Sequence, residues 1–288
     1  MNDNFDRSAE DLGNIVHLEH VNLTVPDPLL ATRFYISALG LTRDPYLMTG
    51  VDNMWVNAGA TQFHLPRGAA QRLRGTVDLV MPDRPALLER LRAGTAGMAG
   101  TEFAFEEHAD HVAVRCPWGN RLRCFEPDGA RFGATRLGIV NIAFEVPVGS
   151  AAGIARFYRE VMGTRASTSA EAAGATSAQV AVGQGQTLCF GETRGELPAY
   201  DGHHIQVYVA DFSGPHRRLS ERGLISEESD QHQYRFLDIS DPQTGAACFR
   251  LEHEVRSTTH PLFKRPLVNR NPAQSNRGYR PGADAFLP

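Results

Sequence analysis

The sequence lacks several features that mark common classes of protein. No apolar run reaches the about 18 residues that suggest a membrane-spanning helix. The N-terminal residues MNDNFDRSAEDLGN are polar and contain no apolar segment typical of a secretion signal. We therefore expect a cytoplasmic protein with no membrane partner. Cysteine is also scarce, and the four cysteines have neither CxxC nor zinc-finger spacing, so we interpret them as small buried hydrophobes.

An excess of basic charge is lacking as well. The formal net charge is −4, and no basic patch interleaved with aromatic residues occurs before the C-terminal segment. This composition excludes nucleic acid as an expected partner and favours a small-molecule substrate. No G-x-S-x-G elbow is present, and GQGQ at 183–186 lies between two apolar runs, as in a hairpin turn rather than a phosphate loop.

What the sequence does contain is an internal repeat. The segment HVNLTVPDPLLATRFYISALG (20–40) has a counterpart in NIAFEVPVGSAAGIARFYREVMG (141–163), and TVDLVMPDRPALLERL (76–91) resembles HIQVYVADFSGPHRRL (204–219). Each segment predicts a strand followed by a helix. The chain, 288 residues long with 42% hydrophobic residues, therefore divides into four units of a strand, a helix and two or three further strands.

Alternation in the predicted first strands indicates one apolar and one polar face. Apolar residues occupy every second position in 20–25, 141–146 and 204–209, and successive side chains of a strand point to opposite faces. The other face carries His20, Asn22 and Thr24 in one strand, Asn141, Ala143 and Glu145 in the next, and His204, Gln206 and Tyr208 in the last. Residues of these types favour a wet cavity over a merely solvated surface.

This pattern resembles the vicinal-oxygen-chelate superfamily, which includes glyoxalases, bleomycin-resistance proteins and extradiol dioxygenases. The resemblance covers about residues 15–255 and is carried by HVNLTVPD with RFYISALGL, QFHLP, CPWGNRL, RFYREVMG, HHIQVYVAD and DPQTGAACFRLEHE. It implies an α+β fold in which four βαβββ modules pair into two half-open β-barrels with helices outside. We expect an N-terminal domain at 15–132 and a C-terminal domain at 136–256.

The remaining segment, 257–288, is rich in proline and has no periodic pattern. Leu262, Phe263, Leu267, Tyr279 and Phe286 give it apolar anchors. We expect an extended arm that lies over its own domain or over a neighbouring subunit, in which case it would support a homodimer.

The superfamily takes metal ligands from the first and last strands of its modules. By position, the resemblance makes His204 a first-strand ligand, and the closing strand resembles that of hydroxyphenylpyruvate dioxygenase, which makes Glu252 the carboxylate ligand. The third position holds Asn141, where these dioxygenases have histidine. Either His232 or His203 completes the site, or no transition metal binds.

The N-terminal half offers His20, Gln62 and His64, which we expect to line a closed pocket. Its second module has Thr76 and Arg123 at the ligand positions, so this half is expected to hold no metal. Around the C-terminal site, Asn141 and Gln206 are expected to bind substrate, Tyr208 and Tyr234 to orient it, and His232 to serve as third ligand or as acid and base.

Three functions are compatible with this pattern. The first is an Fe(II) extradiol-type dioxygenase that acts on a small substrate with neighbouring oxygens, with Mn, Zn and Ni as alternative metals. The second is a glyoxalase-like lyase or isomerase, in which the metal acts as a Lewis acid. The third is a metal-free protein that sequesters a small aromatic or drug-like molecule.

Overall fold

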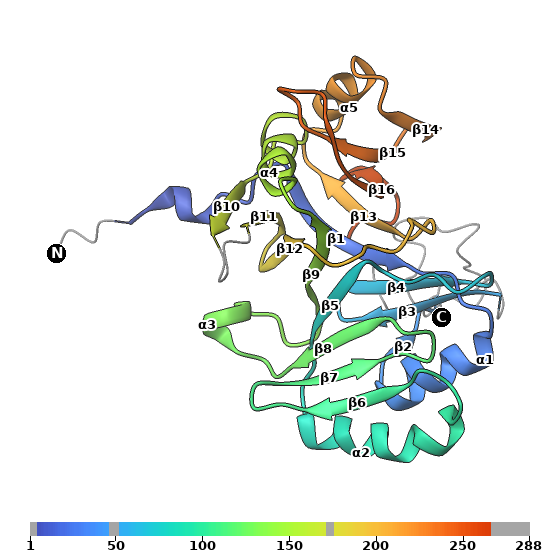
Figure 1. Cartoon of the computed structure of the whole chain (residues 1–288). Helices are drawn as coiled ribbons and strands as arrows, with labels where there is room; N and C mark the ends of the chain where they lie inside the picture. The colour runs from blue at the N-terminus through green and yellow to red at the C-terminus, as the bar shows by residue number, and fades with distance from the viewer. Residues whose placement is uncertain (1–4, 46–51, 171–175, 266–288) are drawn as a thin grey trace, which may run out of the picture.

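Four modules make up the chain, as seen in a computed structural model that describes residues 5–45, 52–170 and 176–265 (Figure 1). A short helix, η1 (Arg7–Glu10), precedes them. The first module contains β1 (Ile15–Asn22), α1 (Pro28–Ala31), η2 (Thr32–Ala38), β2 (Thr42–Arg43), β3 (Asn53–Ala58) and β4 (Thr61–Pro66). The second contains β5 (Gly75–Val80), α2 (Arg84–Gly94), η3 (Thr95–Met98), β6 (Ala104–Glu107), β7 (His111–Arg115) and β8 (Arg121–Phe125).

The second half repeats this order. After α3 (Gly129–Phe132), the third module contains β9 (Gly138–Pro147), α4 (Ala151–Glu160), β10 (Ala166–Ala170), β11 (Thr176–Gly183) and β12 (Gln186–Thr193). The fourth contains β13 (His204–Val209), α5 (Ser213–Ser220), β14 (Ile225–Asp230), β15 (Gln233–Ser240) and β16 (Ala247–Ser257). The predicted α+β fold of four βαβββ modules is confirmed.

The aspartates that follow the first strands have a local role. Asp27 and Asp83 cap the helices that follow, accepting hydrogen bonds from backbone N–H groups that have no partner within the helix. Asp211 likewise accepts a bond from the backbone N–H of the next helix, at 2.9 Å. At the other end, Gly40 and Gly163 have φ values of +80° and +73°, which only glycine adopts without strain. These local signals explain why the repeat was readable from the sequence.

The two sheets do not follow the two halves of the chain. The first sheet has the strand order β14-β15-β16-β13-β1-β4-β3-β2, so it joins modules one and four. The second has the order β10-β11-β12-β9-β5-β8-β7-β6 and joins modules two and three. We expected a separate barrel within 15–132 and within 136–256. That pairing is corrected by the antiparallel ladders β1–β13 and β5–β9, which cross between the halves, while the boundaries themselves stay a prediction.

Two short links explain how this pairing is reached. The chain passes from the first sheet to the second at 67–74 and returns at 194–203. The links are tied together, because Gln71 Nε2 donates to the carbonyl of Asp201 at 2.9 Å and the backbone N–H of Arg72 donates to the Asp201 carboxylate at 2.6 Å. The end of module one and the start of module four are therefore held at the same crossing, where their strands can share a sheet.

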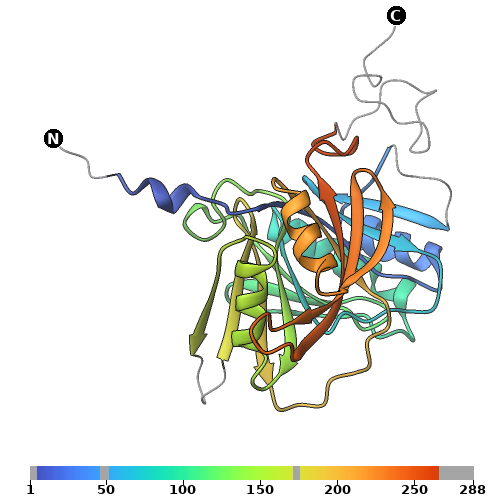
Figure 2. The same cartoon turned by 90° about the horizontal axis from the view of Figure 1, so that it is seen from above.

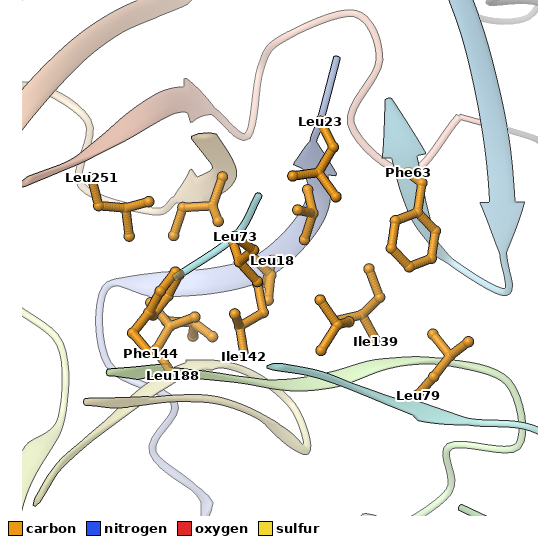
Figure 3. Close-up of a cluster of buried hydrophobic side chains, with 14 of the residues drawn as sticks. Leu18, Leu23, Phe63, Leu73, Leu79, Ile139, Ile142, Phe144, Leu188 and Leu251 are labelled. Carbon is orange, nitrogen blue, oxygen red and sulfur yellow. The ribbon is translucent and has the colours of Figure 1, made fainter. Parts of the chain in front are cut away.

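A shared apolar cluster lies between the sheets (Figure 3). It combines side chains from both, among them Leu18, Leu23, Phe63 and Leu251 of the first sheet and Ile139, Ile142, Phe144 and Leu188 of the second. Helices α1, η2 and α2 group at one end of the molecule, and α4 and α5 at the other (Figures 1 and 2). Because the apolar faces are used in this cluster, the polar faces of the strands are left for other roles.

The expected arm at 257–288 is described as far as Arg265. Phe263 packs against Tyr208, with 4.7 Å between ring centroids, and Arg265 forms a buried ion pair with Asp44. The segment 258–265, which we call the strap, therefore lies against the first sheet. Leu267, Tyr279 and Phe286 lie outside the described residues. Among the described residues, no helix is both long enough and apolar enough to cross a membrane.

Candidate metal centre

Buried polar side chains gather on one face of the first sheet. Paired residues of neighbouring strands direct their side chains to the same face, and β4, β1, β13 and β16 lie next to one another in that order. The polar face, as we call it, comprises His20, Gln62, His64, His204, Gln206, Tyr208, Glu252 and Glu254.

Three of these side chains converge. His20 and Glu254 are each paired with Gln206, from opposite sides, and His204 precedes Gln206 by two residues on the same strand face. Ligand atoms of His20, His204 and Glu254 all lie within 4.8 Å of one another, and the three residues are buried. Two imidazoles and one carboxylate form the ligand set of non-haem Fe(II) sites.

The histidine nitrogens suit a metal. Nε2 of His20 and Nε2 of His204 are buried and have no hydrogen-bond partner in the described part of the chain. Nδ1 of His20 lies 3.3 Å from Glu19 Oε2, a contact that favours the tautomer with its lone pair on Nε2. Burial, together with the nearby His20 and Arg235, lowers the pKa of His204 well below its usual value. His204 is therefore neutral at neutral pH, as a metal ligand must be.

The carboxylates are balanced by two arginines. Glu254 contacts Arg235 Nη2 at 2.6 Å and Arg256 Nη2 at 2.5 Å. Arg235 also contacts Glu252 at 2.5 Å, and Arg256 also contacts Glu19 at 3.1 Å. Three carboxylates and two guanidinium groups sum to a formal charge of −1 (−3 + 2). A carboxylate oxygen has two lone pairs, so Glu254 can keep an arginine and still bind a cation. The residues present therefore fit a divalent metal.

Equivalent positions can be compared across the four modules. In each module we compare one position of the first strand with the closing-strand residue that pairs two places after it. These positions hold His20 with His64, Thr76 with Arg123, Asn141 with Cys189, and His204 with Glu254. The first sheet thus brings together four ligand-type side chains at these positions.

His64 is the fourth of them. Its ring lies 5.8 Å from that of His20 and stacks on Trp55 at 3.8 Å, measured between centroids. Its Nε2 lies 2.6 Å from Asn53 Oδ1. Burial lowers the pKa of His64 well below its usual value, so this imidazole is also neutral at neutral pH. His64 is thus placed beside the triad without belonging to it.

The second sheet holds an ion pair at the corresponding place. Arg123 donates two hydrogen bonds of 2.7 Å to Asp78, and Asn141 Nδ2 donates a third at 2.9 Å. A fixed guanidinium charge repels a metal cation. The expectation that Thr76 and Arg123 make a poor metal site stays a prediction.

Two of the expected metal ligands lie outside the triad. Glu252 lies 3.5 Å from His204 Nδ1 but is held by Arg235, and Glu254 takes the place near both histidines. His232 lies in the turn between β14 and β15, where its Nδ1 is 3.3 Å from Thr259 Oγ1. That turn is outside the cluster, so His232 fits neither as third ligand nor as acid and base, and His20 supplies the second imidazole.

Three other expected residues face elsewhere. Asn141 belongs to the second sheet, because modules three and four do not pair with each other. Tyr234 packs against Phe212 beside α5, on the face of β15 opposite to the polar one. His203 Nδ1 lies 2.6 Å from Asp201 Oδ1, in the link between the sheets. The geometry therefore supports no direct contact of these side chains with a metal or substrate on the polar face.

Tyr208, Gln206 and Gln62 do lie on the polar face. The Tyr208 hydroxyl donates to Glu19 Oε1 at 3.2 Å, and burial raises its pKa, so it stays protonated. Gln62 Nε2 donates to Asp44 at 2.8 Å. Both amide atoms of Gln206, by contrast, are buried without a hydrogen-bond partner among the described residues. Of the three, Gln206 is the one free to bind a substrate.

Sequence reasoning missed Glu254 as a ligand and assigned His20 to a separate pocket. A partial signal for Glu254 was present in the sequence, because it lies two residues after Glu252 and therefore on the same strand face, but the choice between the two depends on the strand register. The signal for His20 was absent, because nothing in the sequence states that module one pairs with module four.

Comparison with known proteins supports the fold. No protein-family model matches the sequence, and no curated protein sequence matches it significantly. Glyoxalase I from Zea mays matches with a TM-score of 0.60 and 12% identity, over 84% of this chain and 92% of that one. A Bacillus subtilis subsp. subtilis str. 168 protein described as a “putative dioxygenase” matches with a TM-score of 0.56 and 15% identity, over 86% of each chain. The chain therefore has the fold of the vicinal-oxygen-chelate superfamily.

Proposed function

We propose that this protein is an Fe(II)-dependent dioxygenase that acts on a small substrate with two neighbouring oxygens. His20, His204 and Glu254 would hold the metal. The observation that carries the proposal is the pair of buried imidazole Nε2 atoms without hydrogen-bond partners, close to a carboxylate. Leaving such atoms unpaired costs free energy, so a protein that keeps them has a use for them.

A divalent metal bound by three protein ligands supplies open coordination positions and Lewis acidity. The chain's own residues then bind and orient the substrate. Gln206 lies between His20 and Glu254 and offers a free amide that can donate to one substrate oxygen. Arg235 holds Glu252 and Glu254 through its two Nη atoms and so fixes these carboxylates beside the triad.

The surroundings of the triad keep it dry and oriented. Glu19 holds His20 through Nδ1, and Tyr208 and Arg256 in turn hold Glu19. A ligand oriented through its second nitrogen binds metal more tightly, because its ring is already in place. Burial of the group also strengthens every electrostatic contact with a substrate.

A glyoxalase-like lyase or isomerase is the second candidate. One observation favours it, namely that His64 stands at the fourth ligand position, so that four protein side chains can surround the metal. A solved structure with the same fold is a glyoxalase I. Such an enzyme uses the metal as a Lewis acid and consumes no oxygen.

Metal content of the protein, purified without a histidine tag and loaded anaerobically with Fe(II), tests the ligand set. We expect about one iron per chain in the wild type, and loss of it in His20→Ala, His204→Ala and Glu254→Gln. Glu252→Gln and His232→Ala are the matched controls and should keep the metal. Retention in Glu254→Gln together with loss in Glu252→Gln would refute this ligand assignment.

Substrate assays separate the two reactions. Oxygen uptake by the iron-loaded protein with catechol as substrate would support the dioxygenase. Isomerisation of a hemithioacetal without oxygen consumption would support the second candidate instead. A wild type that binds no metal after loading would exclude both and leave a metal-free binding protein.

A further inference from the structure

A cavity of about 910 Å³ lies beside the metal centre and has no role in the proposed reaction. It opens between the start of β1, the segment 132–139 that leads into β9, the turn between β11 and β12, and the strap. Its volume is in the range of pockets that hold small ligands. Glu19 and Gln62 line it on the side of the metal centre. Glu19 precedes His20 in the chain, and Gln62 pairs with His20 on the neighbouring strand.

Apolar side chains form a substantial part of its wall. They come from separate parts of the chain and include Leu12, Val16, Phe132, Leu137, Ile139 and Phe263. These residues can enclose a small ring or a short aliphatic body.

Charge at the cavity is predominantly positive. Arg136 and Lys264 line it, are exposed, and form no ion pair with any described residue. Glu19 is the one acidic residue of the lining, and it is already engaged by Arg256 at 3.1 Å. The two free cations therefore have no counter-charge from the described protein, and an anionic group placed near them would supply one.

The wall that carries Lys264 is held in an unusual conformation. Lys264 has a φ of +51°, a left-handed conformation that is uncommon for a residue other than glycine. The strap adopts it between Phe263, which packs on Tyr208, and Arg265, which pairs with Asp44. The packing on both sides keeps Lys264 beside the cavity.

We propose that this cavity binds a small apolar molecule that carries one anionic group, such as an aromatic carboxylate. The apolar body lies against the wall around Phe132 and Phe263, and the anionic group lies between Arg136 and Lys264. The chain's own C-terminal sequence does not complement this charge, because Arg270, Arg277 and Arg280 make it basic.

Calorimetric titration with 2-naphthoate and with its neutral analogue 2-naphthamide tests the proposal on the full-length, metal-free protein. We expect naphthoate to bind at least about fivefold more tightly than naphthamide at low ionic strength, and to lose that advantage in high salt. In the double variant Arg136→Gln and Lys264→Gln, the Kd for naphthoate should rise by about tenfold, and the Kd for naphthamide should change by less than about twofold.

Three further variants locate the site. Ala134→Trp adds bulk at an exposed lining position and should abolish binding of both probes. Arg92→Gln removes an exposed cation that does not line the cavity, and Arg235→Gln removes one at the metal centre; both should leave binding unchanged. Equal affinity for the two probes, absence of naphthoate binding, or loss of binding in Arg235→Gln but not in the double variant would each overturn the proposal.

Discussion

Single residues decide which of the two sheets holds the candidate metal centre. Glu254 and Arg123 occupy equivalent positions in their modules, since each pairs with the residue two places after the first-strand position. A carboxylate there completes a triad with two histidines. A guanidinium there pairs with Asp78 instead and places a fixed positive charge at this position of the second sheet.

Replacement of Arg123 tests this view. In Arg123→Met, the Asp78 carboxylate, which is 7% exposed, keeps only the bond from Asn141. We expect the free energy of unfolding to fall by about 1–2 kcal/mol, because the buried Asp78 stays charged after it loses a partner that is itself partly screened by solvent. Urea denaturation at neutral pH measures the change.

Arg121→Met is the matched control. Arg121 pairs with Glu145, and both side chains are about half exposed, so its loss should cost under about 1 kcal/mol. Equal losses of unfolding free energy in the two variants would show that the Asp78 pair stabilises the protein no more than an exposed pair does.

At the scale of elements, an irregularity in β1 shapes the metal centre. Leu18 pairs with Val207 and His20 with Gln206, so β1 has one extra residue, Glu19, at this point. A β-bulge of this kind re-aims a side chain. Here it lets Glu19 and His20 contact each other on the polar face, whereas regular alternation would place them on opposite faces.

The strap is the second element that matters. Its attachment depends on the Arg265 pair with Asp44, whose side chains are 2% and 0% exposed. In Arg265→Gln, we expect backbone amides of 258–265 to exchange hydrogen at least about tenfold faster, because the strap loses its ion pair with the buried Asp44 carboxylate. Hydrogen-exchange mass spectrometry of peptides from this segment makes the measurement.

Lys264→Gln serves as the control for the strap, because Lys264 is exposed and its ammonium group packs only on Phe263 at 5.3 Å. Its exchange rates should match those of the wild type. Unchanged exchange in Arg265→Gln would show that the rest of the strap holds it in place without this ion pair.

At the scale of the whole molecule, the two halves of the chain interlock. The β1–β13 and β5–β9 ladders each join one strand from the first half with one from the second. We therefore expect fragments 1–135 and 136–288 to co-purify when they are produced together. Each fragment alone should lack cooperative unfolding, because two central strands are left with an unpaired edge.

The fragment experiment also tests the assignment of the metal centre. His20 comes from one fragment, and His204 and Glu254 from the other, so iron should bind only to the pair. Cooperative unfolding and bound iron in fragment 136–288 alone would instead support a site built within the C-terminal half.

Much of the fold could be predicted because its signals are local. Helix caps such as Asp27 and Asp83, terminal glycines and strand alternation depend on neighbours along the chain, and several of them recur between modules. The polar face was predictable for the same reason. His204 and Gln206 were singled out from alternation and lie together on this face, whereas the wet cavity expected there stays a prediction.

The sequence by itself determined the four modules, the helices and which face of each strand is polar, because these follow from residue order at short range. Only the tertiary structure decided which modules share a sheet. All four first strands carry similar edges, so their pairing depends on the links 67–74 and 194–203 and on the apolar cluster between the sheets. That choice brings His20 to His204 and Glu254, and with it the metal centre.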